Sequence, residues 1–211
     1  MFGIHDLALF IVAGLLLNIT PGPDMAYSCS RAASQGLRGG LAALGGIYAG
    51  CVVHTVAATL GLSAILMTSA EAFFIVKMIG AAYLVYVGIC MLRERGAALS
   101  IDGKMPTFAP RHIFWQGFLT NVLNPKIALF YLAFLPQFID STSTQQSAAF
   151  LILGVIFIAN SLLVTVPLVW LVAKSSARIS ASSRAVSWLN RSCGALFVGV
   201  GVKLALAERP S

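Results

Sequence analysis

Six apolar stretches, each long enough to cross a bilayer, occupy almost the whole of the 211-residue chain. A membrane-spanning helix needs about 20 mainly apolar residues. Only 10% of the residues are charged, whereas soluble proteins carry roughly 25%. We therefore expect an all-α polytopic membrane protein that forms a single integral membrane domain over residues 1–211. Its six spans should lie at about 6–28, 40–67, 72–92, 113–139, 147–173 and 189–207.

The basic residues alternate between connections. Three connections, those after the first, third and fifth stretches, hold most of the lysines and arginines, whereas residues 68–71 and 140–146 hold none. Because basic loops stay in the cytoplasm, both termini should lie on the opposite, periplasmic side of a bacterial inner membrane. The net charge of +7 thus reports orientation and indicates no nucleic-acid partner. The basic residues in these connections are Arg31, Arg38, Arg93, Arg95, Lys104, Arg111, Lys174, Arg178, Arg184 and Arg191.

The two halves of the chain share a pattern of residues. In the first stretch Tyr27 follows Pro21 by six positions, and in the fourth Tyr131 follows Pro125 by six. An asparagine lies three or four positions before each proline, at Asn18 and Asn121. We infer two repeats, about 1–92 and about 111–207, joined by a cytoplasmic linker at 93–111. Because each repeat has three spans, the second must be inverted relative to the first, as in many secondary transporters.

Both repeats contain a break in their first span. The first break is Thr20-Pro21-Gly22-Pro23-Asp24, and the second is Asn124-Pro125-Lys126. Proline removes a backbone donor and disrupts the helix, and such breaks persist in a membrane only against protein or a wet cavity. A cap residue followed by proline also marks a new helix start. Each break should therefore direct a helix N-terminus toward an anionic group at the membrane centre.

Asp24 and Lys126 lie just inside these new helix starts. Asp24 either complements the dipole of its own helix or titrates a proton or binds an ammonium group, and we expect one of the latter two. Lys126 opposes its own helix dipole and so needs another partner. That partner is either Asp24 or an anionic group of the substrate; no motif decides between them.

Further polar residues surround the breaks. Thr20, Asn124 and the amides of Asn18, Asn121 and Asn160 could satisfy backbone groups freed by the breaks or hydrogen-bond the substrate. Tyr131 could form a wall of the cavity. Gly46 and Gly50 form a ridge of small residues that we expect to pack closely against the broken first helix, and such ridges would also permit a homodimer.

The two breaks, together with "NPKIALFYLAFLPQF" at 124–138 and "LAALGGIYAG" at 41–50, give the chain a family resemblance. It resembles the lysine-exporter and homoserine/threonine-exporter (LysE/RhtB-type) family over essentially its whole length. The resemblance implies an inner-membrane exporter of amino acids or close derivatives, driven by the proton gradient. Family substrates include lysine, arginine, threonine, homoserine and its lactone, and leucine, and nothing in this sequence selects among them.

Other classes of function fit the sequence less well. A thiol-redox conduit needs a cysteine pair at matching positions, but the position that matches Cys29 holds Ala133. A metal-cation exporter would have only Asp24 and His54 as obvious intramembrane ligands. No nucleophile motif, paired carboxylates or nucleotide loop suggests an enzyme. We expect no cofactor and no bound metal, and a small amino-acid-like solute and the lipid bilayer as partners.

Overall fold

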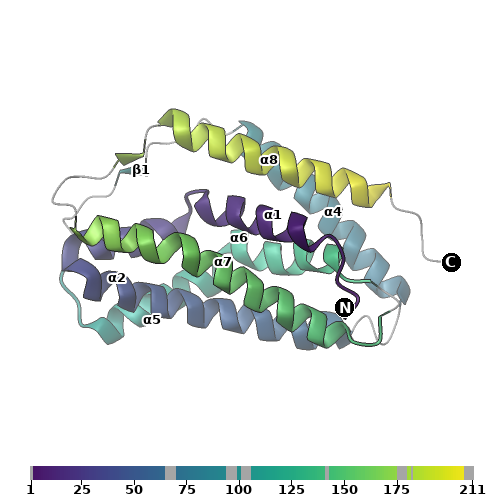
Figure 1. The fold of residues 1–211 in the computed structure, drawn as a ribbon, viewed down its shortest axis with the longest axis horizontal. Coiled ribbons are helices and arrows are strands. Elements are labelled where there is room, and N and C mark those ends of the chain that lie inside the picture. Colours follow the sequence, from purple (N-terminus) through teal and green to yellow (C-terminus); the bar gives the residue numbers. More distant parts are fainter. Residues whose placement is uncertain are drawn as a thin grey trace.

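A computed structural model describes residues 2–64, 70–93, 99–100, 106–140, 143–174, 180–181 and 183–206. Figure 1 shows its long helices lying side by side along the longest axis of the molecule. The helical elements are α1 (Leu7–Ile19), α2 (Pro23–Ala57), η1 (Ala58–Leu62), α4 (Ala70–Arg93), α5 (Pro110–Val122), α6 (Pro125–Leu129), η2 (Phe130–Phe134), η3 (Leu135–Phe138), α7 (Gln146–Lys174) and α8 (Ser183–Ala205). Two-residue strands, β1 (Leu99–Ser100) and β2 (Ser180–Ala181), pair antiparallel and are the described exception to an all-helical fold.

The first predicted break is present. Helix α1 ends at Ile19, and α2 begins at Pro23 with Gly22 in an extended conformation as its N-cap. Thr20 before Pro21 and Gly22 before Pro23 are both pairs that can start a helix, and the chain uses the Gly22–Pro23 pair. Thr20 and Pro21 lie between the two helices and belong to neither.

Helix α2 folds back on itself at Gln35 and Gly36. Their backbone is non-helical, and Gly36 has φ 66° and ψ −166°, a conformation that is essentially restricted to glycine. A Cβ placed on Gly40 would lie 2.9 Å from the Cβ of Ala32, whereas eight residues of straight helix would separate them by about 12 Å. We call residues 23–34 the first arm of α2 and residues 37–57 the second arm; they correspond to the end of the first predicted span and to the second.

The second predicted break is also present. Helices α5 and α6 are separated by Leu123 and Asn124, and the direction of the chain changes there by 48°. After α6 the chain continues through η2 and η3. Helix α7 then runs for 29 residues with Pro167 inside it.

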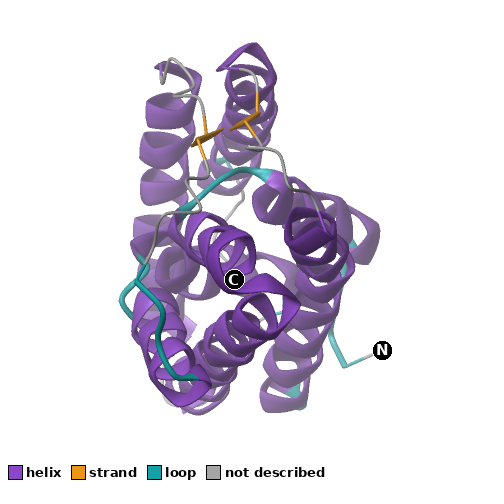
Figure 2. Ribbon diagram, turned by 90° about the vertical axis from the view of Figure 1, so that its left-hand side faces the viewer, coloured by secondary structure: helices purple, strands orange, loops and turns teal. Residues whose placement is uncertain are grey.

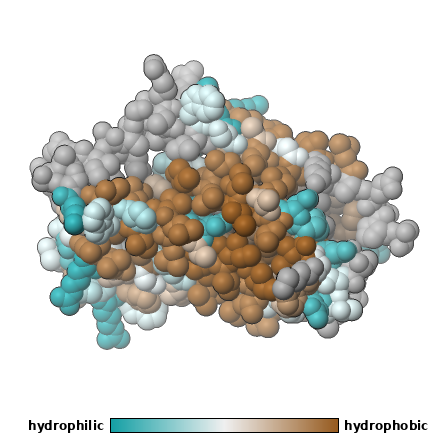
Figure 3. Space-filling model, viewed as in Figure 1, coloured by the Kyte–Doolittle hydropathy of each residue, from teal (hydrophilic) through white to brown (hydrophobic). Residues whose placement is uncertain are grey.

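The described helices are apolar enough for a membrane protein. Two of them, Pro23–Leu62 and Gln146–Lys174, are long and apolar enough to span, and the bent pair Pro110–Phe138 could form a third span. Leu7–Ile19 and Met78–Arg93 are shorter apolar helices. Figure 3 shows a broad hydrophobic surface across the middle of the molecule and hydrophilic residues toward its ends. Six spans and the inverted repeat remain predictions.

The exposed basic residues gather at one end of the molecule. There α2 reverses, α4 and α7 end, and α5 begins (Figure 1). Arg38, Arg93, Arg111 and Lys174 are exposed there, as the charge pattern predicts. Figure 2 views the molecule from this end, with the β1–β2 pair near the viewer. Arg31 differs from the prediction, because it is buried in the first arm of α2 and is not in a connecting loop.

The glycine ridge of α2 packs closely, but against a different helix from the one predicted. A Cβ on Gly46 would overlap the backbone of Phe114, and one on Gly50 would contact the side chain of Asn121. Both neighbours belong to α5, so the ridge packs on the first helix of the second half and not on α1. The absence of side chains at these glycines lets the two backbones approach each other.

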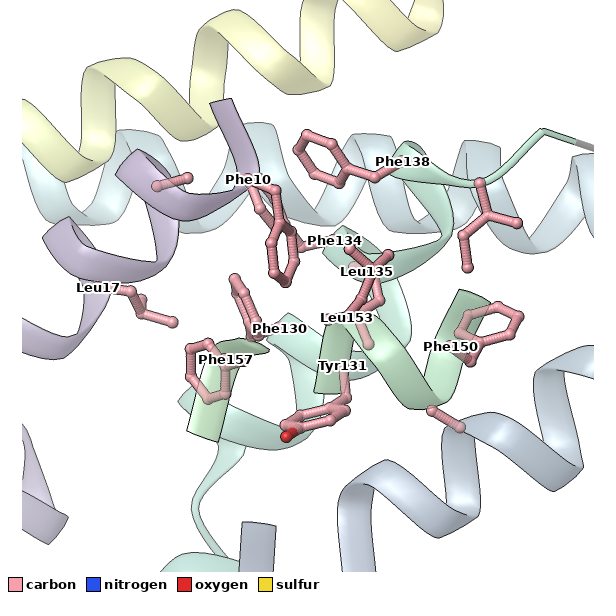
Figure 4. Packing of buried hydrophobic residues seen from close by; sticks show 14 of the residues in the cluster. Phe10, Leu17, Phe130, Tyr131, Phe134, Leu135, Phe138, Phe150, Leu153 and Phe157 are labelled. Atoms are coloured by element: carbon pink, nitrogen blue, oxygen red, sulfur yellow. The ribbon is translucent and has the colours of Figure 1, made fainter. Parts of the chain in front are cut away.

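Two hydrophobic clusters hold the helices together. The first, which we call the aromatic cluster, contains Phe10 of α1, Phe130, Phe134 and Phe138 of η2 and η3, and Phe157 of α7 (Figure 4). Neighbouring rings in it have centroids 4.3 to 6.2 Å apart. The second cluster joins the two arms of α2 to α7 and contains Met25, Cys29, Ala32, Leu44, Ile47, Val169 and Val172.

The glycine packing yields a prediction with an adjacent control. Gly46→Ala should lower the free energy of unfolding by about 1–3 kcal/mol, because the added methyl group overlaps the α5 backbone. Gly45→Ala should change it by no more than about 1 kcal/mol, because Gly45 is exposed and its nearest neighbour, a Phe114 ring carbon, would lie 3.5 Å away. Thermal unfolding of both variants in detergent measures the difference. Equal stability of the two variants would contradict this packing.

Candidate functional site

A polar cavity lies between the two helix breaks. Its empty volume, including open solvent at its mouth, is about 490 Å³. Both hydrophobic clusters contribute to its lining. Leu17 and Phe157 come from the first cluster, and Met25 and Ile47 come from the second. The cavity is therefore a polar layer between two apolar regions. Its lining residues are Leu17, Asn18, Thr20, Gly22, Asp24, Met25, Ser28, Leu44, Ile47, Cys51, Asn121, Asn124, Lys126, Ile127, Phe157, Ser161 and Thr165.

Asp24 and Asn121 join the two halves of the chain across this cavity. Asp24 lies in the first turn of α2, and Asn121 is a buried residue in the last turn of α5. The Asn121 Nδ2 group donates a hydrogen bond of 2.7 Å to Asp24 Oδ2. This bond to a carboxylate is of the stronger, charge-assisted kind. It fixes one oxygen of Asp24 and leaves the other directed elsewhere.

Three buried polar atoms of the lining residues have no hydrogen-bond partner among the described residues. They are Asp24 Oδ1, Asn121 Oδ1 and Asn18 Nδ2. The site thus offers two acceptors, one of them a carboxylate oxygen, and one donor. A buried polar group without a partner is unfavourable by about 1–3 kcal/mol. A ligand that supplies a donor to the two oxygens and an acceptor to the amide would remove this penalty.

Lys126 reaches back to the end of α1. Its Nζ donates hydrogen bonds of 2.9 Å to the carbonyl oxygens of Leu17 and Thr20. These carbonyls lie at the first break, where the helix no longer supplies donors. The ammonium group also lies at the negative end of the α1 dipole, where a cation is favourable. This position explains why a lysine is tolerated in the first turn of α6, where it opposes that helix's own dipole.

The two new helix starts differ in how their backbone groups are satisfied. At α6, Asn124 Oδ1 accepts from the Lys126 N–H at 3.0 Å, and the Asn124 carbonyl accepts from the Ile127 N–H. Asn124 is therefore an N-cap, as its position before Pro125 predicts. No side chain caps α2 in the described structure, where Gly22 is the N-cap. Of the two helix starts predicted to meet an anion, the one at α2 is open and the one at α6 is capped by its own asparagine.

Two of the polar residues predicted for the site do not line the cavity. Tyr131 is buried, its hydroxyl accepts a hydrogen bond of 3.0 Å from Thr55, and its ring stacks on that of His54. Asn160 Nδ2 donates to the Ile11 carbonyl at 3.3 Å and so ties α7 to α1. Thr20, Gly22, Asn18, Asn121 and Asn124 do line it. The three prolines at the breaks, Pro21, Pro23 and Pro125, shape the backbone around it without being lining residues.

Sequence reasoning missed the wall of the cavity that the second arm of α2 forms, whereas Ser161 and Thr165 already stand out in the sequence as a polar patch of the fifth apolar stretch. Leu44, Ile47 and Cys51 lie on one face of the second arm of α2, at the spacing of three and four residues that a helix face requires. Ser161 and Thr165 of α7 stand four residues apart and both hydrogen-bond the Tyr48 hydroxyl. Their periodicity was available in the sequence, but it does not reveal which face meets the cavity.

No group of three or more histidine, cysteine, aspartate or glutamate side chains that could hold a metal ion occurs in the described part of the chain. All four cysteines are free. The polar groups at the cavity are amides, hydroxyls, one carboxylate and one ammonium group. Such groups suit a small solute that carries both donors and acceptors.

Comparisons with known proteins find similar sequences over almost the whole chain. Residues 15–208 match the family model for the LysE type translocator. An uncharacterized membrane protein of Vibrio cholerae is 32% identical over 205 residues, covering 97% of this chain and 98% of that protein. A homoserine/homoserine lactone efflux protein of Salmonella typhimurium is 32% identical over 94% of this chain and 95% of its own. A leucine efflux protein of Salmonella choleraesuis is 28% identical over 98% of both chains. No solved structure matches.

The role of Lys126 can be tested through stability. Lys126→Met keeps most of the length of the side chain but removes the donors to the Leu17 and Thr20 carbonyls. We expect it to lower the free energy of unfolding by about 1–3 kcal/mol for each carbonyl left without a donor. Lys126→Arg, which keeps the charge and N–H donors, should retain most of the stability. Thermal unfolding in detergent compares the two with the unmodified protein. A Lys126→Met protein as stable as the unmodified one would contradict this role.

Proposed function

The chain belongs to the family of LysE-type translocators, and we propose that it is a secondary transporter that exports amino acids or close derivatives from the cytoplasm. As a member of a translocator family it is a transporter and not an enzyme. The observation that carries the proposal is a pair of oxygens, Asp24 Oδ1 and Asn121 Oδ1, that have no hydrogen-bond partner among the described residues and belong to side chains lining a cavity between two helix breaks. The alternative solute is another small molecule of mixed polarity.

The cavity suits the two charged groups of an amino acid. The α-ammonium group would donate to Asp24 Oδ1 and Asn121 Oδ1, which are both acceptors. The α-carboxylate would lie at the uncapped start of α2, where N–H groups and the positive end of the helix dipole favour an anion. Asn18 Nδ2 would add a donor to it. This arrangement leaves Lys126 holding the end of α1, with its charge near the carboxylate.

The side chain of the substrate would meet the remaining walls. Leu44, Ile47 and Met25 offer an apolar surface, and Ser161 and Thr165 offer hydroxyl groups. Relatives named for leucine and for homoserine or its lactone have substrates with an apolar or a hydroxyl-bearing side chain. We propose an uncharged solute of this kind, within the general class of amino acids and close derivatives.

The transport cycle we propose uses six spans in two inverted repeats in the inner membrane, with both termini periplasmic. One repeat rocks against the other around the cavity, so that the cavity is exposed first to the cytoplasm and then to the periplasm. A proton taken up by Asp24 from the periplasm would neutralise the carboxylate and weaken its hold on the ammonium group. Proton uptake and solute release would thereby be coupled through a single side chain.

Two experiments test the function itself. Cells that overexpress the protein should resist inhibitory concentrations of one amino acid or analogue in a screen across the common ones. Counterflow of that solute into proteoliposomes containing the purified protein should then occur without ATP. Absence of counterflow for every amino acid and lactone tested would overturn the proposal.

Removal of the Asp24 charge should abolish most of the export. In Asp24→Asn the ammonium group loses a charged acceptor, and a hydrogen bond to a charged group contributes about 1.5–3 kcal/mol, so we expect export to fall on the order of tenfold to a hundredfold. Asp6→Asn is the control, because Asp6 is exposed at the start of α1, away from the cavity lining. The initial rate of counterflow measures both. Normal export by Asp24→Asn would contradict the ammonium and proton roles.

A double variant separates two roles of Lys126. If Lys126 acted only as the ion partner of Asp24, neutralising both residues would restore part of the function lost in Lys126→Met. Because its ammonium group holds the Leu17 and Thr20 carbonyls, we expect no such rescue in Asp24→Asn/Lys126→Met. Counterflow of the four proteins, corrected for the amount folded, gives the result. Partial rescue would show that the ion pair is the main role.

A further inference from the structure

Two side chains of the first arm of α2, together with the adjoining Gln35, form a clamp on α5 and on the segment before it. Tyr27 and Arg31 are four residues apart and so lie on one face of the arm, and Gln35 follows four residues later, where the helix is interrupted. We call these three residues, with Phe108 and Gln116 opposite them, the inner clamp. Arg31 is the centre of the clamp, and its side chain is only 2% exposed.

Each of the three residues contacts the partner segment. Arg31 donates from Nη1 to the Pro106 carbonyl and from Nη2 to Gln116 Oε1, both at 2.9 Å. The Tyr27 hydroxyl donates to the Ile113 carbonyl at 2.9 Å and lies 3.0 Å from Gln116 Oε1. Gln35 and the Phe108 backbone exchange two hydrogen bonds, of 2.8 and 3.0 Å. These contacts connect the broken helix of one half to the broken helix of the other.

The partners of Arg31 among the described residues are neutral groups. Its guanidinium group lies 4.8 Å from the Phe108 ring centroid and 5.4 Å from that of Tyr27. Its Nε has no hydrogen-bond partner among the described residues. A buried charge that is held by a carbonyl, an amide oxygen and two rings is held less firmly than one paired with a carboxylate. Water can replace these hydrogen bonds one at a time.

The inner clamp lies between the cavity and the basic end of the molecule. Ser28, the neighbour of Tyr27, lines the cavity. From there Arg31 and Gln35 lead along the first arm to the reversal at Gly36, beside which α5 begins (Figure 1). The positive-inside rule assigns this end to the cytoplasm.

The opposite side of the cavity is closed by different chemistry. There Phe10 of α1 packs against Phe134 and Phe138, with centroid distances of 6.2 and 5.2 Å (Figure 4). Phe134 and Phe138 lie about two to four turns beyond the start of α6. Arg31 and Gln35 lie at a similar distance beyond the start of α2. At a similar distance beyond its break, one half thus carries aromatic packing and the other a polar clamp. Separating packed aromatic rings exposes apolar surface, whereas opening the clamp exchanges hydrogen bonds with water.

We propose that the inner clamp is the cytoplasmic gate of the cavity, and that it opens when Arg31 exchanges Gln116 and Pro106 for water. This inference rests on the proposed function, since a gate has meaning only for a transporter. It adds the residues that control entry of the solute from the cytoplasm. Arg31 is a gating residue that does not contact the solute.

A native cysteine can report the state of the gate without any substrate. Cys51 lines the cavity. In a protein with Cys29, Cys90 and Cys193 replaced by serine, a membrane-impermeant maleimide applied to inside-out vesicles should label Cys51 slowly. Arg31→Gln and Gln116→Ala should each raise that rate on the order of tenfold, the effect of losing a hydrogen bond to a charged group. Arg38→Gln is the control, because Arg38 is exposed at the same end.

Right-side-out vesicles and a second reporter complete the test. Labelling from the periplasmic side should not rise in the same variants, because the aromatic cluster is unchanged. Ser28→Cys in a cysteine-free protein should respond as Cys51 does, since Ser28 also lines the cavity. Unchanged labelling from the cytoplasmic side, or an equal rise from both sides as a loosened fold would give, overturns the gate. Because labelling needs no solute, a gate response without amino-acid export would reject the proposed function and leave the gate standing.

Discussion

Unpaired backbone groups at the two helix breaks are the constraint on which this structure depends. Lipid offers no hydrogen bonds, so groups freed by the prolines must find partners inside the protein. Lys126 supplies donors to the Leu17 and Thr20 carbonyls, and Asn124 accepts from the first N–H groups of α6. The break in one half is therefore completed by a residue at the break in the other. The hydrogen bonds of Lys126 require the two breaks to lie next to each other, and the polar cavity lies between them.

Close helix packing and the chemistry of the cavity are linked through Asn121. The absence of a side chain at Gly50 provides the space that the Asn121 amide occupies, and that amide hydrogen-bonds Asp24. A ridge of small residues on α2 thus serves two purposes. It brings the backbones of α2 and α5 together, and it lets a buried amide of α5 reach the carboxylate at the start of α2.

The two sides of the cavity are built from unlike interactions. Aromatic rings of α1, η2, η3 and α7 pack on one side, and a buried arginine with two glutamines and two aromatic residues joins α2 to α5 on the other. Dispersion between rings is non-directional, whereas hydrogen bonds at Arg31 depend on geometry and can be exchanged with water. In the transport cycle that we propose, a cavity between such unlike sides would open to one side at a time.

The sequence by itself determined the features that depend on local chain chemistry. Apolar length indicates membrane helices, the prolines locate both breaks, and Asn124 before Pro125 specifies a helix cap. The tertiary structure alone decided the partner of Lys126, the burial of Arg31, the packing of the glycine ridge on α5, and the positions of Tyr131 and Asn160 outside the cavity wall. The physical reason is the distance along the chain over which each interaction acts. Proline and cap residues act on backbone groups within one turn, whereas a lysine or arginine side chain takes its partners from whichever helices pack beside it, here 75 to 109 residues away along the chain.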